Sequence, residues 1–373
     1  SKDKTSNEVQ GVISAYPQEN VRLIRVENGG KARALNIGIE QAQYDLLVVL
    51  DADAVLDTEA LWHFTKHFGD ERVGAVAGKV CTTGSSRLLD LFQMLEYAIG
   101  QNIDKRAFSV VGAVGVVPGP AGAWRRARVI ELGGFSVDTL AEDQDMTLTI
   151  LRAGNKIVYE PEALAYTETP HTVKNFLKQR FRWVYGTMQC FWKHKGAFRE
   201  KRGSALSIVV LPNVFVFNIV LPLLYPFADS ALLIGLFFGE WRTLVLPFIL
   251  FTAFDLVYAM WGLWGEKNAW KLMLAVPLQR IVYRQLLYYT VMRSVVRALE
   301  GTGSGWSKFA KSGETKRFYF TALLEPSVPT PQGAGGVASS LPLTVSPLAH
   351  EEVVVLATTA PARESASNLQ QVM

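Results

Sequence analysis

Residues 44–53, YDLLVVLDAD, decide the fold class of this 373-residue chain. Five consecutive apolar residues, 46–50, stand between Asp45 and Asp51. A short apolar run with polar ends is typical of a strand that is buried on both faces of a parallel sheet. In such sheets ligands bind outside the carboxyl ends of the strands, so the sequence places Asp51 and Asp53 at a candidate site.

Strand and helix patterns alternate on both sides of this stretch. The sequence predicts further strands over residues 21–26 and 73–80, and helices over residues 31–43 and 58–68. This alternation indicates an α/β domain with a doubly wound sheet. We expect the domain to fill residues 1–200.

The apolar residues of the chain concentrate after this domain. Residues 203–228 contain no charged side chain and are long enough to cross a bilayer as a helix. Residues 243–265 form a second candidate span, interrupted only by Asp255. Residues 230–239 are short for a span, and residues 272–296 contain arginines. These two segments are either weak spans or helices that lie at the interface or re-enter the membrane.

Charge and composition indicate how the rest of the chain is arranged. Basic residues lie directly before the first span: Lys193, Lys195, Arg199, Lys201 and Arg202. By the positive-inside rule they place the α/β domain in the cytosol, with membrane helices over residues 203–300. Residues 301–373 are rich in Pro, Ala, Ser and Thr, which predicts a polar, largely disordered tail. Residues 353–356 resemble a strand, but their flanks do not support one.

Two groups of carboxylates have positions suited to chemistry. Asp51 and Asp53 can both reach a divalent cation or the diphosphate that it bridges, although such pairs are also frequent in solvated loops. Glu142 and Asp143 precede a helical pattern at residues 146–151. A carboxylate there can accept the proton of an attacking hydroxyl, but acidic residues also stabilise a first helical turn without any catalytic role.

A third group combines side chains that bind sugars and phosphates. Gln179, Arg180, Arg182 and Trp183 supply an amide, two guanidinium groups and an indole within five residues, just before the first span. An indole offers a face for stacking on a sugar ring, and the amide and guanidinium groups can bind hydroxyls or phosphate oxygens. The alternative is a basic amphipathic helix that lies on the membrane surface.

These groups belong to a series of motifs in a fixed order. The series is NGGK at residues 28–31, DAD at 51–53, GPAG at 119–122 with Arg125 and Arg126 after it, Glu142–Asp143, and Gln179-x-x-Arg182-Trp183. It resembles the processive family 2 glycosyltransferases, which include cellulose, chitin, hyaluronan and bacterial poly-N-acetylglucosamine synthases. The resemblance covers residues 1–315. The poly-N-acetylglucosamine synthases are the most similar of these groups in size and in the membrane segments that follow.

The resemblance implies a nucleotide-sugar-binding domain of the GT-A type. Asn28, Gly30 and Lys31 would line the nucleotide pocket. Asp51 would contact the nucleotide diphosphate, and Asp53, with Asp51 beside it, would bind Mg²⁺ or Mn²⁺.

The same resemblance assigns the reacting groups. Asp143 would be the general base and Glu142 would support it. Gln179, Arg182 and Trp183 would hold the diphosphate and the acceptor terminus. Arg125 and Arg126 are either structural or in contact with the acceptor.

The reaction implied is inverting transfer from a UDP-sugar, with UDP-N-acetylglucosamine favoured, onto a growing β-linked polysaccharide. The protein would be a multi-pass protein of the inner cell membrane, in contact with the lipid bilayer and with room for an accessory membrane subunit. No nucleic-acid partner is indicated, because the formal net charge is only +4.

One departure from the family concerns the start of the chain. In the family a DDGS segment ends the first strand, and Ser1-Lys2-Asp3 resembles the trailing end of that segment. We therefore expect the first strand, a uridine-contacting carboxylate and any amino-terminal membrane helix to lie upstream of Ser1, in an amino-terminally truncated domain.

Three other functions stay open at this stage. A single-transfer enzyme that glycosylates a lipid phosphate would use the same donor site. An inactive membrane scaffold would keep the fold without the activity. A transporter would explain Arg280 and Arg284 within an apolar segment, but it leaves the cytosolic motifs without a role.

Overall fold

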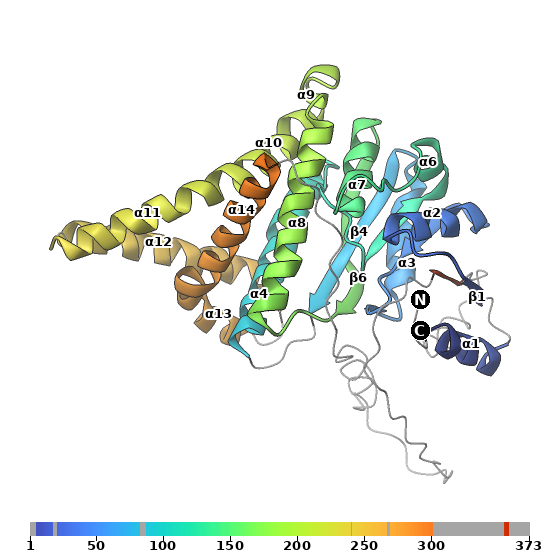
Figure 1. Cartoon of the computed structure of the whole chain (residues 1–373), viewed down its shortest axis with the longest axis horizontal. Coiled ribbons are helices and arrows are strands. Elements are labelled where there is room, and N and C mark those ends of the chain that lie inside the picture. Colours follow the sequence, from blue (N-terminus) through green and yellow to red (C-terminus); the bar gives the residue numbers. More distant parts are fainter. Residues whose placement is uncertain are drawn as a thin grey trace, which may run out of the picture.

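The computed structural model describes residues 5–17, 21–82, 87–239, 241–266, 269–300 and 354–357. Figure 1 shows an α/β domain around a central sheet, with a helical region that projects from one side of it. Most of the tail predicted at residues 301–373 lies outside the described residues.

The central sheet has five strands, which are β2 (Leu46–Val49), β3 (Val55–Leu56), β4 (Val73–Thr82), β5 (Gly122–Arg125) and β6 (Lys156–Thr167). Their order is β2-β5-β4-β6-β3, in which β4 and β6 are parallel and every other pair is antiparallel. The α/β class is confirmed. The parallel, doubly wound arrangement is wrong, because β5 returns antiparallel between β2 and β4. An apolar run indicates burial but not the direction of the neighbouring strand.

The first predicted strand lies outside this sheet. β1 (Val21–Ile24) pairs antiparallel with β7 (Val354–Ala357) in a separate two-stranded sheet. Residues 354–356 of the segment 353–356 are therefore in a strand although their flanks do not support one, because their pairing partner lies far away in the sequence.

Helices cover both faces of the central sheet. On one face α2 and α7 share a hydrophobic core with Ala75 and Ala77 of β4, and on the other face α3 shares one with Val76. This alternation follows from the strand geometry, because successive side chains point to opposite faces. The helices of the domain are α1 (Thr5–Ala15), α2 (Lys31–Gln41), α3 (Ala60–Thr65), η1 (Lys66–Gly69), α4 (Leu88–Ile99), η2 (Gly100–Lys105), α5 (Arg106–Val110), α6 (Arg126–Glu131), α7 (Glu142–Arg152), α8 (Val173–His194) and α9 (Ala197–Glu200).

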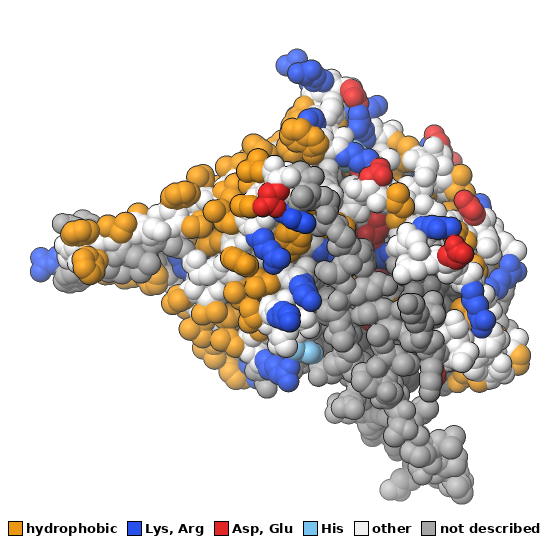
Figure 2. Space-filling model, in the orientation of Figure 1, with side chains coloured by type: hydrophobic (Ala, Val, Ile, Leu, Met, Phe, Trp, Pro, Cys, Tyr) orange, Lys and Arg blue, Asp and Glu red, His pale blue; other side chains and the backbone are white. Residues whose placement is uncertain are grey.

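The projecting region contains two helices that are long and apolar enough to cross a membrane, Leu206–Phe227 and Leu244–Gly262. They match the spans expected at residues 203–228 and 243–265. Figure 2 shows hydrophobic side chains spread over the surface of this region. Its elements are η3 (Leu206–Val210), α10 (Leu211–Phe215), η4 (Val216–Val220), α11 (Leu221–Phe237), α12 (Trp241–Gly262), α13 (Ala269–Leu278), η5 (Gln279–Tyr283) and α14 (Arg284–Leu299).

The last helices return to the α/β domain. α13 packs against α4, and α14 packs against α8. Two arginines of this part face a carboxylate of α12: Arg284 Nη2 donates to Asp255 Oδ1 over 3.0 Å, and Arg280 Nη1 lies 3.8 Å from Asp255 Oδ2. The structure thus gives these charges a structural partner, which removes the feature that favoured a transporter.

Candidate functional site

Three charged side chains from distant parts of the sequence meet beyond the end of β2. Lys31 is the first residue of α2, Asp51 follows β2, and Glu142 is the first residue of α7. The Lys31 Nζ atom lies 2.6 Å from Asp51 Oδ1 and 3.0 Å from Glu142 Oε1. The fold therefore gathers these predicted site residues into one cluster.

Asp143 joins this cluster through a glycine loop. Its Oδ2 atom accepts a hydrogen bond from the backbone N–H of Gly119 over 3.2 Å, and its Oδ1 atom accepts one from Gln144 N over 2.8 Å. A Cβ atom at Gly119 would stand 2.7 Å from Lys31 Nζ and 3.2 Å from Asp51 Oδ2. A side chain at this position would crowd the Lys31–Asp51 pair, which explains the glycine at position 119.

The cluster shifts the pKa of both its base and its cation. Burial raises the pKa of Asp143 to about 6, and the negative charge of Glu142 adds to this while Lys31 opposes it. Burial acts to lower the pKa of Lys31, but Asp51, Glu142 and Asp143 outweigh it and raise that pKa above its ordinary value. A carboxyl group with a pKa near neutrality suits a general base, and the lysine stays charged.

The donor atoms of the cluster fit a hard divalent cation. The carboxylates of Asp51, Glu142 and Asp143 act on a single ammonium group, so the cluster carries a negative charge excess. Asp53 adds a further half-buried carboxylate in the turn after β2. Mg²⁺ and Mn²⁺ prefer such oxygen ligands.

The NGGK segment contributes mainly through its backbone. Gly30 has a φ of 90° and precedes the first turn of α2, a conformation that favours glycine. Asn28 is exposed, and its Oδ1 atom accepts a hydrogen bond from Gly30 N over 3.4 Å. Of this segment, the side chain brought to the carboxylates is that of Lys31.

The residues of the third group all lie on α8. Gln179 is 8% exposed, and its Oε1 atom has no hydrogen-bond partner among the described residues. Trp183 is half-buried, with the Arg180 guanidinium 4.4 Å from its ring centroid and the ring of Tyr97 at 6.4 Å. Arg182 is half-buried as well.

Tyr97 of α4 packs beside Trp183 of α8 and lies within the electrostatic influence of the carboxylate cluster. Burial raises the pKa of Tyr97 to about 12, and the charges of both Asp51 and Arg182 act on it. Asp51 and Arg182 therefore lie near the same side chain.

A sequence profile described as "Glycosyltransferase like family 2" matches residues 1–186. The match includes the whole carboxylate cluster and the three residues of α8. This chain belongs to glycosyltransferase family 2.

Curated relatives of this family 2 glycosyltransferase include poly-beta-1,6-N-acetyl-D-glucosamine synthases. The protein from Staphylococcus aureus (strain COL) is 35% identical over 161 residues, which are 43% of this chain and 39% of that protein. The protein from Staphylococcus epidermidis is 33% identical over 197 residues, which are 51% of this chain and 48% of that protein. The match thus spans less than half the length of these relatives.

A solved structure shares the fold of this glycosyltransferase. It is a mannosyltransferase from Pyrobaculum calidifontis in complex with GDP-Man and Mn²⁺, with a TM-score of 0.52 and 22% sequence identity. The similarity covers 76% of this chain and 75% of that one. At this identity the comparison establishes the GT-A-like fold.

Sequence reasoning did not identify the ion pair that supports the α8 motif. Arg180 Nη2 lies 2.6 Å from Glu96 Oε2 of α4 and 3.2 Å from the hydroxyl of Tyr283 in η5. The Tyr283 hydroxyl also donates to Glu96. Arg180 is only two residues from Arg182, so residue type alone could not separate the structural arginine from the candidate ligand.

Three other basic residues lie in the same domain. Arg125 donates to the backbone carbonyls of Phe68, Asp70 and Val73, and Arg126 donates to carbonyls at the end of α2, which favours the structural alternative for both. Lys105 was not predicted. Burial lowers its pKa to about 8, against the opposing charge of Asp143.

Proposed function

We propose that this glycosyltransferase transfers N-acetylglucosamine from UDP-N-acetylglucosamine, with inversion, onto a growing β-linked polysaccharide. The observation that carries the proposal is Asp143, a buried carboxylate with a raised pKa beside the Lys31–Asp51 pair. The synthases that match this chain supply the identity of the sugar.

In the proposed mechanism the chain's own residues bind, orient and move a proton. Asp143 takes the proton of the acceptor hydroxyl while the hydroxyl oxygen bonds to C1 of the sugar. The bond between C1 and the phosphate oxygen breaks, and UDP leaves with the electron pair. Lys31 and Arg182 stabilise the charge on the departing diphosphate.

The acceptor is held by the α8 residues. Trp183 stacks on the terminal sugar, and the free Oε1 atom of Gln179 accepts a hydrogen bond from an acceptor hydroxyl or from the donor. Asp51 and Asp53 would hold Mg²⁺ or Mn²⁺, which when bound neutralises charge on the diphosphate.

We further propose that the helices at Leu206–Phe227 and Leu244–Gly262 cross the cell membrane, with the catalytic domain in the cytosol. The basic residues that precede the first of them support this orientation. The bilayer then lies directly beside α8, where the acceptor is expected.

The test is incorporation of radiolabel by membranes that express the full-length gene, with UDP-N-acetylglucosamine and UDP-glucose compared in the presence of Mg²⁺ or Mn²⁺. We expect polymer from UDP-N-acetylglucosamine. Polymer from UDP-glucose alone would mean that glucose, not N-acetylglucosamine, is the sugar transferred. A single sugar added to a lipid would indicate the single-transfer enzyme. No product from either donor would favour the inactive scaffold.

The pKa of Asp143 makes the pH dependence of this reaction a further prediction. The base accepts a proton only when it is ionised, so kcat/KM should be constant above about pH 7 and fall through a midpoint near pH 6. Below the midpoint the loss should approach about tenfold per pH unit. Initial rates between about pH 4.5 and 8 measure it, and a midpoint near 4, the value of an ordinary aspartate, would contradict the assignment.

A further inference from the structure

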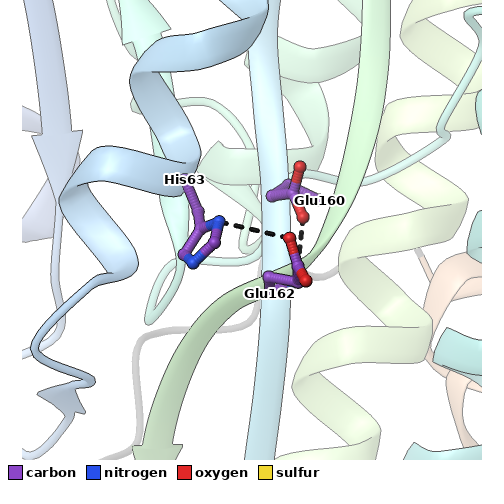
Figure 3. A group of neighbouring side chains, drawn as sticks. All are labelled: His63, Glu160 and Glu162. Atoms are coloured by element: carbon purple, nitrogen blue, oxygen red, sulfur yellow. Dashed lines mark hydrogen bonds and ion pairs between the residues drawn. The ribbon is translucent and has the colours of Figure 1, made fainter.

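A second group of potential metal ligands lies between α3 and β6, away from the residues assigned above. His63 of α3, Glu160 and Glu162 of β6 each offer one ligand atom, and these atoms all lie within 4.8 Å of one another. The His63 Nδ1 atom is 3.3 Å from Glu162 Oε2. Figure 3 shows the imidazole and the two carboxylates turned toward one another.

The fold holds these residues on rigid elements. Along β6 the register steps from Glu160 opposite Gly78 to Leu164 opposite Lys79, so residues 161–163 bulge out of the ladder with β4. Bulges of this kind re-aim side chains. The Glu162 backbone N–H donates to Glu160 Oε1 over 2.9 Å, which holds the Glu160 carboxylate against the backbone of the bulge.

The helix on the opposite side is fixed equally well. Ala60 and Phe64 of α3 are fully buried against the sheet in the same core cluster as Ala163 and Ala165 of β6. His63 is the neighbour of Phe64, so its ring is directed by a buried helix. The backbone that carries the candidate ligands is therefore fixed by packing, and the side chains of His63 and Glu160 are 17% and 5% exposed, whereas the Glu162 side chain is 64% exposed and reaches the group from the surface.

A cation already occupies the centre of this group. The Lys66 ammonium lies 3.0 Å from Glu160 Oε2, 3.0 Å from Glu162 Oε2 and 3.1 Å from His63 Nδ1. The lysine side chain is 35% exposed and can turn out into solvent, whereas Glu160 is 5% exposed and cannot. An ammonium that contacts all three ligand atoms marks the position where a metal ion would bind.

Another histidine supports this arrangement from outside. His67 lies one helical turn after His63, and its Nε2 atom is 2.6 Å from Glu160 Oε2. Second partners of this kind orient a metal-binding carboxylate and raise its affinity.

We propose that His63, Glu160 and Glu162 form a binding site for a divalent transition metal ion such as Zn²⁺, which displaces the Lys66 ammonium. One imidazole and two carboxylates suit Zn²⁺ or Co²⁺ better than Mg²⁺ or Ca²⁺, which prefer oxygen ligands alone. Three protein ligands leave a position open for water. The ion would tie α3 to β6, and this site is distinct from the cation site at Asp51 and Asp53.

The test uses the full chain, purified in detergent and freed of metal, with Zn²⁺ or Co²⁺ as the probe. Calorimetric titration with Zn²⁺ should detect one site that survives Asp51→Asn/Asp53→Asn, a variant that lacks the donor-site carboxylates. Co²⁺ should give the visible absorption of a low-symmetry nitrogen-ligated ion. Zn²⁺ should raise the unfolding temperature in a concentration-dependent manner, because it binds the folded chain.

Single substitutions identify the ligands. His63→Ala should abolish this site, and His67→Ala should weaken it by about 10- to 100-fold. Lys66→Ala should strengthen it by up to about fivefold, the equivalent of one exposed ion pair, because the competing ammonium is gone. Glu59→Ala is the matched control, since Glu59 is exposed, lies 3.8 Å from the other ring nitrogen of His63, and is not a proposed ligand.

The outcomes separate the proposal from its alternatives. Zn²⁺ binding that is lost in Asp51→Asn/Asp53→Asn but kept in His63→Ala would overturn it, as would the absence of Zn²⁺ binding by the full chain. Metal-free His63→Ala must unfold at the same temperature as the metal-free parent, which shows that the variant is folded. If it unfolds at a lower temperature, the weaker Zn²⁺ binding expected of His67→Ala is used as the test instead. None of these measurements requires transferase activity.

Discussion

Replacing Asp143 with asparagine is expected to lower the rate of sugar transfer by about 10²- to 10⁴-fold, the usual contribution of a general base. Binding of UDP-N-acetylglucosamine should change little, because Lys31 and Asp51 remain in place. Radiolabel incorporation measures the first quantity and equilibrium binding of the donor measures the second.

The same substitution should not destabilise the fold. The folded-state pKa of Asp143 is about 6, above the value near 4 of an unfolded chain. Ionisation of Asp143 therefore lowers the free energy of unfolding as the pH rises from about 4 to about 6. At pH 7 asparagine removes this cost, and the unfolding temperature should stay constant or rise.

Asp138→Asn is the matched control, because Asp138 is an exposed carboxylate a few residues away that lies 3.7 Å from Lys193. It should retain full transfer. Full transfer by Asp143→Asn would instead remove Asp143 as the base, and a lowered unfolding temperature would indicate a structural role.

Replacing Arg180 with alanine should produce the second large effect, on stability. The change leaves the Glu96 carboxylate and the Tyr283 hydroxyl without their buried partner and removes the side chain that packs on Trp183. Breaking a fully buried pair typically costs about 3–5 kcal/mol. Because the Glu96 side chain keeps 34% of its surface in solvent, we expect about 2–3 kcal/mol in the free energy of unfolding.

Denaturant unfolding of the detergent-solubilised chain measures this loss. Arg293→Ala is the matched control, since Arg293 of α14 is exposed and contacts only the face of Phe181 among the interactions described, with 5.1 Å between guanidinium and ring centroid. It should cost less than about 1 kcal/mol.

A double variant separates loss of the pair from loss of packing. Arg180→Ala combined with Glu96→Gln removes the charge left behind, so it should be more stable than Arg180→Ala alone. Equal stability of the two variants would mean that packing on Trp183, rather than the ion pair, is what Arg180 provides.

The local patterns of the sequence predicted much of the fold. The apolar run before Asp51 becomes β2, the pattern after Glu142 becomes α7, and both candidate spans are helices. These features depend on periodicity and composition within a short window. The antiparallel return of β5 and the pairing of β1 with β7 depend on contacts between distant segments, which no short window contains.

The candidate site divides in the same way. The order of the motifs made Lys31, Asp51 and Glu142 candidates, and the fold brings them into contact. The partners of Arg180 come from α4 and η5, which are remote in sequence, so its role could not be predicted. The group around His63 was missed because its histidines and its glutamates lie on two separate elements.

The length of α8 has a consequence that no single side chain reveals. In its first half Arg180 is held by Glu96, and at its end Lys193 and His194 each contact Asp145 over 2.9 Å. Asp145 lies two residues after the proposed base. A helix advances about 100° per residue, so inserting or deleting one residue between these attachments would turn one of them away from its partner. Natural variants of this helix should therefore accept substitutions but conserve its residue count.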